Sequence, residues 1–294
     1  MKNINKTHKI SLLNLTHSEK NSKLSEIFKH MQGVITHISE SDFINIISTQ
    51  HDIAQKLKIY YENGEIIGFT SWRVERVHIN DKGYDIHRSL NIIRPDKRSV
   101  SSEKFILSEI LTYCIKNIFS KYQSIFVCRS DGPVTYYVFH KYIPTIYPSA
   151  TNNHNSFLED LAYKLADKLS IPICNHNPIR TTSPFKVNDS IEDKKRWQSR
   201  NEQSVQYFLT HCPNYLDEHH QDNARSLLLV FECGFKNWIS SIIRLIKSRG
   251  IVWFFGKKTH SITKAAKNCY YNLVSIKIAS TDYALITSQF MSSI

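Results

Sequence analysis

The feature that most constrains this fold is a two-residue turn between two segments that favour β-structure. Asn63 and Gly64 both accept the positive φ angles of a tight hairpin turn, and Asn-Gly is the strongest short signal for one. Leu57–Tyr61 before the turn and Ile66–Val74 after it are rich in β-branched and aromatic residues. The sequence therefore predicts an antiparallel pair of strands here.

The segments after this hairpin continue an alternation of strands and helices. A third strand is predicted over Tyr84–Ile93, ended by Pro95, which has no amide for a β-ladder. A helix beginning at Ser101 or Ser102 carries an apolar stripe at the helical period. Residues 124–128, SIFVC, then read as a buried strand, and residues 133–142, PVTYYVFHKY, as a short helix. A strand, a helix and a strand in this order predict a parallel pair.

The flanking segments extend the α/β pattern. Upstream, the sequence predicts an amphipathic helix ending at Gly33, a strand over 33–39 and a helix over 39–57. Downstream, three prolines between Ile171 and Asp189 suggest a linker or lid. The other downstream predictions are helices over 156–170, 193–212, 235–248 and 262–271, and strands over 226–232, 251–256 and 273–287.

Together these segments predict an α/β fold with a mixed, mostly antiparallel central sheet flanked by helices, and an additional α/β region at the C-terminal end. The expected organisation is an N-terminal helical segment over 1–33, a core over 34–150 and a C-terminal α/β region over 151–294. The last region is expected to be a second, degenerate copy of the core or part of an acceptor-binding region.

Composition narrows the class of protein. The formal net charge is +12, and the basic excess is divided evenly between the two halves, which argues against a nucleic-acid-binding tail but suits an anionic ligand such as coenzyme phosphates. Six cysteines stand singly and no metal-binding motif occurs, so we expect free thiols and no metal. Neither a signal-peptide core nor a run of about 20 apolar residues is present. A cytoplasmic protein without a membrane span is expected, and secretion without a signal stays open.

The turn between the third strand and the following helix carries the clearest chemistry. Residues 94–105, RPDKRSVSSEKF, join an apolar strand to an amphipathic helix. The unpaired amides at a helix N-terminus and the positive end of its dipole both favour an anion. Lys97 and Arg98 add cationic side chains that suit phosphate. The turn is therefore a candidate pyrophosphate site, with a simple capped helix start as the alternative.

This stretch resembles the GCN5-related N-acetyltransferase superfamily. The family signature is a strand, a proline-containing turn, then Gln or Arg, two residues, Gly, one residue, and Gly or Ala at the start of a helix. The corresponding positions here run from Arg98 to Glu103, with Ser101 and Glu103 in place of the two small residues. The resemblance implies acetyl-CoA or a longer acyl-CoA as co-substrate, without a metal. It places cofactor contacts at Ile92, Ile93, Arg98, Ser99, Val100, Ser101 and Ser102.

The same resemblance suggests catalytic residues. It places helix 133–142 where the family often carries a tyrosine that protonates the departing thiolate, and Tyr136 and Tyr137 are the candidates. Asp85 and His87 share one face of the third strand and are candidate bases for an amine, directly or through water. The alternatives are that both tyrosines belong to the core and that His87 is solvent-exposed or held by a structural hydrogen bond.

Two functions of different classes follow. The first is an acyltransferase that moves an acyl group from acyl-CoA, or from an acyl carrier protein, to an amine or hydroxyl acceptor on a small molecule or a protein. The third strand would polarise the thioester carbonyl through a backbone amide. The second is a non-catalytic acetyltransferase-like module that binds a protein or, against the even charge distribution, a nucleic acid. A bacterial effector that modifies a host protein is a weaker third hypothesis.

Overall fold

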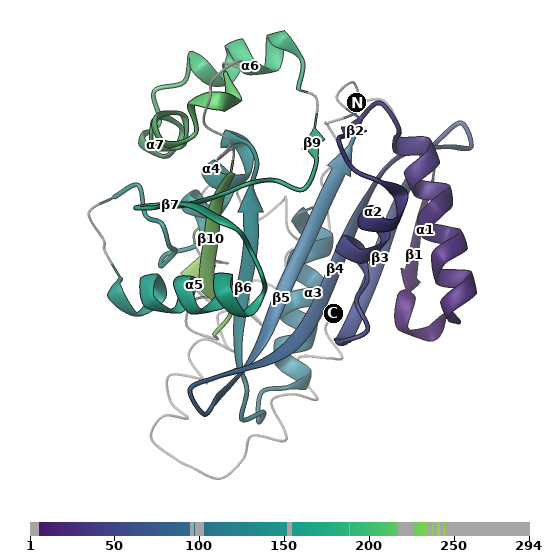
Figure 1. Ribbon diagram of the computed structural model, residues 1–294, viewed down its shortest axis with the longest axis horizontal. Coiled ribbons are helices and arrows are strands. Elements are labelled where there is room, and N and C mark those ends of the chain that lie inside the picture. The colour runs from purple at the N-terminus through teal and green to yellow at the C-terminus, as the bar shows by residue number, and fades with distance from the viewer. Residues whose placement is uncertain are drawn as a thin grey trace, which may run out of the picture. The chain divides into compact units, whose positions relative to one another are not determined.

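A computed structural model (Figure 1) describes residues 6–94, 97, 103–151, 155–187, 189–216, 226–234, 237, 240–241 and 244. The chain divides into two compact units, Met1–Trp238 and Ile239–Ile294, and every helix and strand named below lies in the first. The predicted turn residues Arg98–Ser102 lie outside the described residues. So do the elements predicted between residues 235 and 287, apart from the four isolated positions just given.

Eight strands form one mixed sheet in the order β1-β3-β4-β5-β6-β10-β8-β7, and β2 pairs with β9 in a separate two-stranded sheet. Neighbouring strands run antiparallel except β5 and β6, which are parallel. The strands are β1 Lys6–Ser11, β2 Ile35–Thr36, β3 Asp52–Glu62, β4 Glu65–Ile79, β5 Lys82–Ile93, β6 Gln123–Ser130, β7 Ile173–His176, β8 Ile179–Thr181, β9 Lys186–Val187 and β10 Ser226–Glu232. The predicted fold class, and the order of elements in the stretch that resembles the acetyltransferases, are confirmed.

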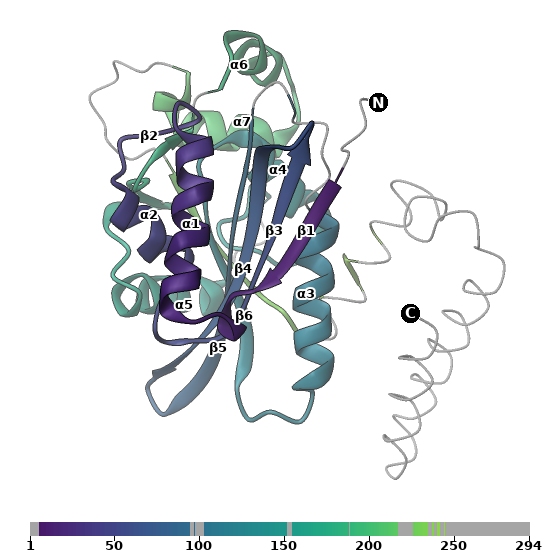
Figure 2. The ribbon, with the colours of Figure 1, turned by 90° about the vertical axis from the view of Figure 1, so that its right-hand side faces the viewer.

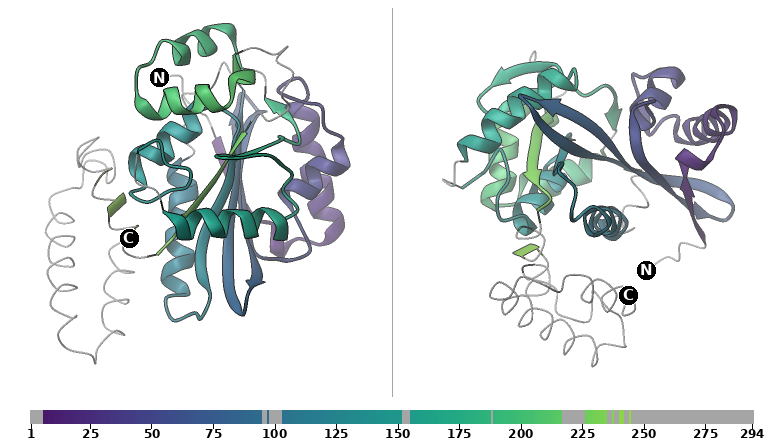
Figure 3. Two further views of the ribbon diagram at one scale, coloured as in Figure 1. Left: turned by 60° about the vertical axis from the view of Figure 1, so that its left-hand side comes forward. Right: turned by 90° about the horizontal axis from the view of Figure 1, so that it is seen from below.

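Helices cover both faces of the sheet (Figures 2 and 3). Helices α1 and α2 pack on β3 and β4 around Phe69, and α5 packs on β6 and β10 around Val230 on the same face. Helices α3, α4 and α7 pack around Phe126 on the opposite face. The helices are α1 His17–Met31, α2 Glu40–Ile47, α3 Glu103–Lys116, α4 Pro133–Tyr142, α5 Ser156–Lys168, α6 Ile191–Gln198 and α7 Gln203–His211, with short 3₁₀ turns at Leu12–Asn14 and Pro213–Tyr215.

The predicted hairpin is present and sets the register of the sheet. Asn63 and Gly64 have φ angles of 51° and 85°, as the tight turn requires. A second tight turn at Asn80 and Asp81, also with positive φ, joins β4 to β5. The pairing of β4 with β5 is unbroken from Gly68 opposite Ile93 to Ile79 opposite Lys82. Side chains therefore alternate strictly between the two faces along this pair.

The helix predicted over 39–57 is wrong in its second half. It begins as expected, since the Ser39 side chain accepts a hydrogen bond from the Asp42 amide, but α2 ends at Ile47. The chain enters β3 at Asp52, where Leu57 and Ile59 point into the core beneath α1. Pairing with β4 outweighs local helix propensity here. The strand predicted over 33–39 is reduced to two residues.

The predicted linker or lid over 171–189 is also wrong. About half of it forms β7, β8 and β9, and β7 and β8 belong to the main sheet. Pro172 and Pro178 lie just outside the ends of β7, which is an outer strand, so neither proline interrupts a ladder. The single helix predicted over 193–212 is two helices, α6 and α7, separated between Gln198 and Gln203. The predicted helix 156–170 and strand 226–232 are confirmed as α5 and β10.

Candidate functional site

The parallel strands β5 and β6 pair over only part of their length. Their register runs from Tyr84 opposite Gln123 to His87 opposite Phe126. Beyond this point β5 follows β4 to Ile93 while β6 follows β10, and the two strands diverge (Figure 1). Within the described residues, no strand pairs with β5 on this side beyond His87. The result is a wedge between β5 and β6 in the middle of the sheet.

Backbone amides of β5 face this wedge. The Arg94 amide donates to the Ile67 carbonyl at 3.0 Å and so points toward β4. Because amides alternate in direction along a strand, those of Ile93 and Asn91 point away from β4, toward β6. Both side chains of the predicted cofactor pair are buried, Ile92 beneath α1 and α2 and Ile93 against Tyr60. Of Ile92 and Ile93, only Ile93 directs its backbone amide toward the wedge.

The wedge opens toward the end of β5 that leads into the predicted phosphate turn. Lys97 lies in this turn, and its ammonium forms an ion pair with Glu62 at 2.5 Å. The predicted cofactor contacts at Arg98, Ser99, Val100, Ser101 and Ser102 lie outside the described residues and stay predictions. Helix α3 is described from Glu103 onward, as the predicted helix start requires.

A charged strip crosses β3, β4 and β5 on the face that carries α1, α2 and α5. It consists of Asp52, Arg73, Glu75 and Arg88. The Arg73 guanidinium contacts Asp52 at 2.7 Å and Glu75 at 3.7 Å, and Arg88 contacts Glu75 at 3.4 Å. Burial, together with the like charge of Arg73, lowers the pKa of Arg88 to about 10, so Arg88 is still charged at neutral pH. Arg88 is the first residue of β5 beyond the segment that pairs with β6.

Sequence reasoning missed this strip, although a signal was present. Arg73, Glu75 and Arg88 interrupt segments that otherwise favour strands, and a charged side chain inside a strand of a central sheet needs a partner.

A second missed group, Asp131, follows the end of β6 and accepts a hydrogen bond from the Ser226 hydroxyl. Burial raises the pKa of Asp131, against the opposing effects of that hydrogen bond and of Arg129.

Asp85 lies in the paired half of β5, on the face that carries α3. Its side chain is fully buried, with one carboxylate oxygen 2.8 Å from the Arg76 Nε atom and the other 2.8 Å from the Tyr113 hydroxyl, which donates to it. Burial and this hydrogen bond raise the pKa of Tyr113 well above its usual value. Asp85 is thus held by a cation and a phenol rather than facing solvent.

His87 shares this face with Asp85, as the alternation predicted, but the face is buried beneath α3. Neither ring nitrogen has a hydrogen-bond partner in the described part of the protein. The ring lies among aromatic side chains, 5.0 Å from Tyr113 and 5.9 Å from Trp72 between centroids. Burial lowers the pKa of His87 to about 4, against the opposing charge of Asp85. His87 is therefore neutral at pH 7, and its role as a base stays a prediction.

The two candidate tyrosines of α4 have different surroundings. Tyr136 is fully buried, donates its hydroxyl to the Pro148 carbonyl at 3.0 Å and stacks on Tyr207. Burial raises the pKa of Tyr136. Tyr137 is half-buried, and its hydroxyl accepts a hydrogen bond from Lys141 at 3.3 Å. Tyr137 therefore carries the more accessible hydroxyl, and its role as an acid stays a prediction.

Two further features, a metal site and a membrane-spanning helix, were sought among the described residues. No group of three or more His, Cys, Asp or Glu side chains there could hold a metal ion. None of the described helices is both long enough and apolar enough to cross a membrane.

No protein-family model matches the sequence, and no curated protein matches it. Solved structures that match include a probable N-acyltransferase from Enterococcus faecalis (10% identity, TM-score 0.31, covering 47% of this chain and 33% of that one). An acetyltransferase from Trypanosoma brucei matches at 17% identity and a TM-score of 0.29, covering 46% of this chain and 90% of that one. Glucosamine-6-phosphate N-acetyltransferase from Arabidopsis thaliana matches at 16% identity and a TM-score of 0.27, covering 45% of this chain and 87% of that one. The match spans a third of the Enterococcus protein. All three TM-scores are too low for the likeness to bear on fold or chemistry.

Proposed function

We propose that this protein is an acyltransferase that moves an acyl group from acyl-CoA to an amine or hydroxyl acceptor. The observation that carries the proposal is the wedge between β5 and β6. An extended thioester arm fits between diverging strands as a short extra strand, and its carbonyl would accept a hydrogen bond from a wedge-facing amide such as that of Asn91 or Ile93. The predicted phosphate turn follows directly after β5, where the coenzyme diphosphate would lie.

In the proposed reaction the acceptor nitrogen or oxygen attacks the thioester carbonyl carbon. A carbon–nitrogen or carbon–oxygen bond forms, the carbon–sulfur bond breaks, and the acceptor loses a proton while the thiolate gains one. The wedge-facing amide stabilises the developing oxyanion. Tyr137 is the preferred thiolate acid, because the Tyr136 hydroxyl is committed to Pro148. His87 is neutral at pH 7 and could accept a proton, but its lowered pKa makes it a weak base, so it is proposed as the base only with a shift of its pKa toward 7 when the acceptor binds.

The proposal names the chemical class of the acyl donor and of the acceptor, not the individual molecules. The net charge of +12 suits the phosphates of a coenzyme and also the acidic surface of an acyl carrier protein, which is the second candidate donor. The acceptor is a small amine or a protein amine, with a hydroxyl as the alternative. A cytoplasmic location follows from the sequence expectation and belongs to the same proposal.

The first test is calorimetric titration with acetyl-CoA and a long-chain acyl-CoA. Binding with a dissociation constant on the order of micromolar is expected. The double variant Arg98→Ala with Ser101→Glu should abolish it, because it removes a cation and adds an anion at the predicted diphosphate contact. Lys121→Ala, which removes a cation from the loop after α3, is the control and should bind normally. No heat with any thioester would contradict the proposal and leave the non-catalytic module as the better hypothesis.

The wedge itself is tested by removing one amide. Asn91→Pro eliminates an amide that faces away from β4, whereas Asn91→Ala loses the same side chain and the same hydrogen bond from Thr70 but keeps the amide. Acyl transfer should fall about 10²–10³-fold in the proline variant relative to the alanine variant if this amide polarises the carbonyl. Equal rates in the two variants would exclude the Asn91 amide from that role.

A further inference from the structure

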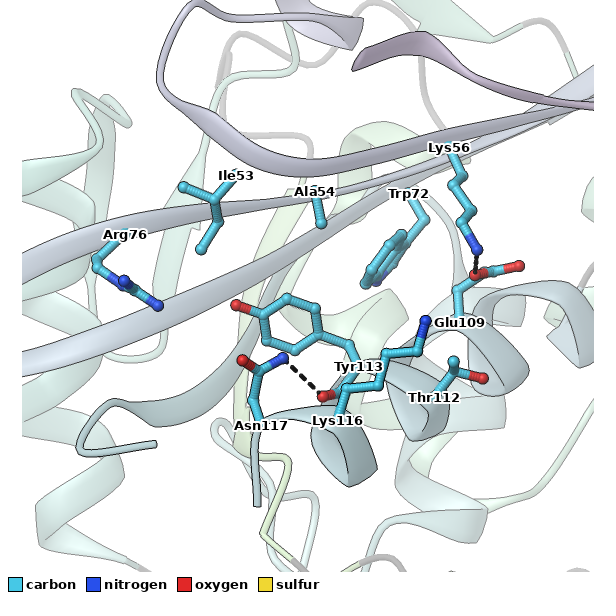
Figure 4. Close-up of a pocket in the computed structure, with 10 residues that line it drawn as sticks. All are labelled: Ile53, Ala54, Lys56, Trp72, Arg76, Glu109, Thr112, Tyr113, Lys116 and Asn117. Carbon is cyan, nitrogen blue, oxygen red and sulfur yellow. Dashed lines mark hydrogen bonds and ion pairs between the residues drawn. The ribbon is translucent and has the colours of Figure 1, made fainter. Parts of the chain in front are cut away.

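A pocket of about 410 Å³ lies on the opposite face of the sheet from the charged strip, between the second half of α3 and strands β3 and β4 (Figure 4). A volume of this size is typical of sites for small organic ligands. Trp72 projects into it from β4, and Tyr113 and Thr112 line it from α3. Ile53 and Ala54 of β3 complete an apolar wall. Nothing in the proposed acyl transfer uses this space.

The shape of the pocket favours a flat ligand. The Trp72 and Tyr113 rings meet edge to face with centroids 6.0 Å apart, so two aromatic surfaces lie at an angle to each other. An aromatic guest between such surfaces gains both buried area and ring contacts. The neighbouring Ala54 side chain is short and leaves this part of the pocket wide.

The charges of the pocket leave one cation uncompensated. Lys56 is paired with Glu109 at 2.6 Å, and Arg76 is paired with Asp85 at 2.8 Å. Lys116 also lines the pocket, is exposed, and has no ion-pair partner within the described residues. The pocket therefore carries a surplus of one positive charge at a side chain that is free to turn toward a ligand.

The pocket also borders polar atoms that lack partners. The Trp72 Nε1 atom and both ring nitrogens of His87 are buried without a hydrogen bond in the described part of the protein. His87 does not line the pocket, but its ring packs against Trp72 at 5.9 Å and against Tyr113 at 5.0 Å between centroids. Nearly all buried polar groups of folded proteins have a partner, and leaving one unpaired costs about 1–3 kcal/mol. Because the protein itself already buries these atoms, a ligand would meet the ring surfaces and Lys116 rather than these nitrogens.

We propose that this pocket binds a small planar aromatic carboxylate. The ring lies against Trp72 and Tyr113, and the carboxylate forms an ion pair with Lys116. The pocket shares no lining residue with the wedge, and its one contact with the proposed machinery is the candidate base His87, whose ring packs against Trp72 and Tyr113. Binding of an aromatic carboxylate and acyl transfer are measured separately, and variants at Lys116 leave His87 unchanged, so failure of one proposal is distinguishable from failure of the other.

The test uses 2-naphthoate and its uncharged analogue 2-naphthamide as probes, titrated into the full chain by calorimetry. Naphthoate is expected to bind about tenfold more tightly than naphthamide, which is the contribution of one partly exposed ion pair. Lys116→Ala should reduce naphthoate affinity to the level of naphthamide and leave naphthamide unchanged, whereas Lys116→Arg should keep the preference. Lys121→Ala makes the same charge change outside the pocket lining and serves as the matched control.

A second variant tests the position of the ring. Thr112→Trp fills the pocket from α3 and should abolish binding of both probes, with circular dichroism confirming that the variant folds. Absence of naphthoate binding up to about 5 mM, weaker than any useful affinity, would overturn the proposal. Naphthoate binding that is equally strong in wild type and in Lys116→Ala would overturn it as well. The Lys116 comparison decides the matter even if Thr112→Trp does not fold.

Discussion

The two faces of the sheet formed by β3, β4 and β5 each bury a carboxylate beside an arginine, but the arginine is buried on one face and partly exposed on the other. On the face that carries α1, α2 and α5, the Asp52 and Arg73 side chains are almost completely buried and pair directly. On the face that carries α3, Asp85 is buried but its partner Arg76 keeps about a third of its side chain exposed, at 34%. A neutral His87, without a hydrogen-bond partner among the described residues, lies on the same face.

On the face with Asp52 and Arg73, the charges hold the fold together, whereas on the face with Asp85 the arginine can still reach solvent. Substitution of one member of a buried ion pair is strongly destabilising, because the other charge is then left buried without a counter-ion. A buried histidine without a hydrogen-bond partner in the described part of the protein gains contacts from its ring but nothing from its nitrogens. We therefore expect variants of the first face to act mainly on folding and variants of the second to act on pH response and binding.

The largest expected effect breaks the paired face. Arg73→Met removes the cation beside the buried Asp52 carboxylate, which then keeps its hydrogen bonds from Thr49 but no counter-charge at Arg73, and should lower the free energy of unfolding by about 3–5 kcal/mol. Arg76→Met on the other face should cost only about 1–2 kcal/mol, because water can reach Asp85 through the space vacated and Tyr113 still donates to it. Urea titrations of the two variants measure both values. Equal losses would show that the two faces do not differ in this respect.

The next effect concerns pH. The pKa of His87 is about 4 in the folded protein against an ordinary 6.5, so the unfolded chain binds this proton more tightly. Stability is complete above pH 6.5 and is lost as the pH falls toward 4, by about 3 kcal/mol from this group. His87→Leu should flatten that decline and be at least as stable as wild type at pH 7. Urea midpoints between pH 7 and pH 4.5 test this.

The rate of acyl transfer by His87→Leu is measured alongside its stability. If His87 acts as the base, His87→Leu loses turnover while gaining resistance to acid. A variant that keeps both its activity and the wild-type acid sensitivity would remove His87 from the mechanism and from the pH response together.

A smaller effect tests how the open end of β5 is held. A Cβ atom on Gly68 would lie 2.6 Å from the Ile92 carbonyl oxygen and 2.8 Å from the Ile93 Cα atom, both backbone atoms that cannot turn away. Gly68→Ala should therefore cost about 1–3 kcal/mol and displace β5 at the wedge. Gly234→Ala, where an added Cβ atom would meet no described neighbour within 4 Å, is the matched control and should be nearly neutral. Thermal denaturation compares the two, and equal midpoints would contradict the close packing of β4 on β5.

The smallest effect separates the two tyrosines. Tyr136→Phe loses one buried hydrogen bond and should cost about 0.5–1.5 kcal/mol without affecting the chemical step. Tyr137→Phe should change stability by less than about 0.5 kcal/mol but slow acyl transfer if Tyr137 is the acid. Rate and stability measured together on both variants decide the assignment. A rate loss confined to Tyr136→Phe would reverse it.

Much of the fold could be predicted because its signals are local. Asn63-Gly64, the alternation along β5 and the apolar stripe of α3 each specify their own element within a short window. The failures arise where distant partners decide. Residues 52–57 have no strong local preference and become a strand because β4 pairs with them, and residues 173–181 join the sheet because β10 lies beside them.

Less of the candidate site could be predicted, for the same reason. The wedge depends on where the pairing of β5 with β6 stops, which no local pattern encodes. Alternation placed Asp85 and His87 on one face, but only the packing of α3 reveals that this face is buried. The pairing of Arg73 with Asp52 likewise joins side chains whose relation depends on the register of two strands.

The place of β10 has a consequence for the order in which the chain can become stable during synthesis. This strand lies inside the sheet, and its Glu232 side chain accepts a hydrogen bond from Gln123, 109 residues earlier. Until β10 emerges from the ribosome, β6 presents an unpaired edge with buried residues such as Phe126 beside it. Such late closure is slow and leaves apolar surface open to aggregation. We expect nascent chains that stop before residue 226 to need a chaperone, whereas those that include β10 can close the sheet themselves.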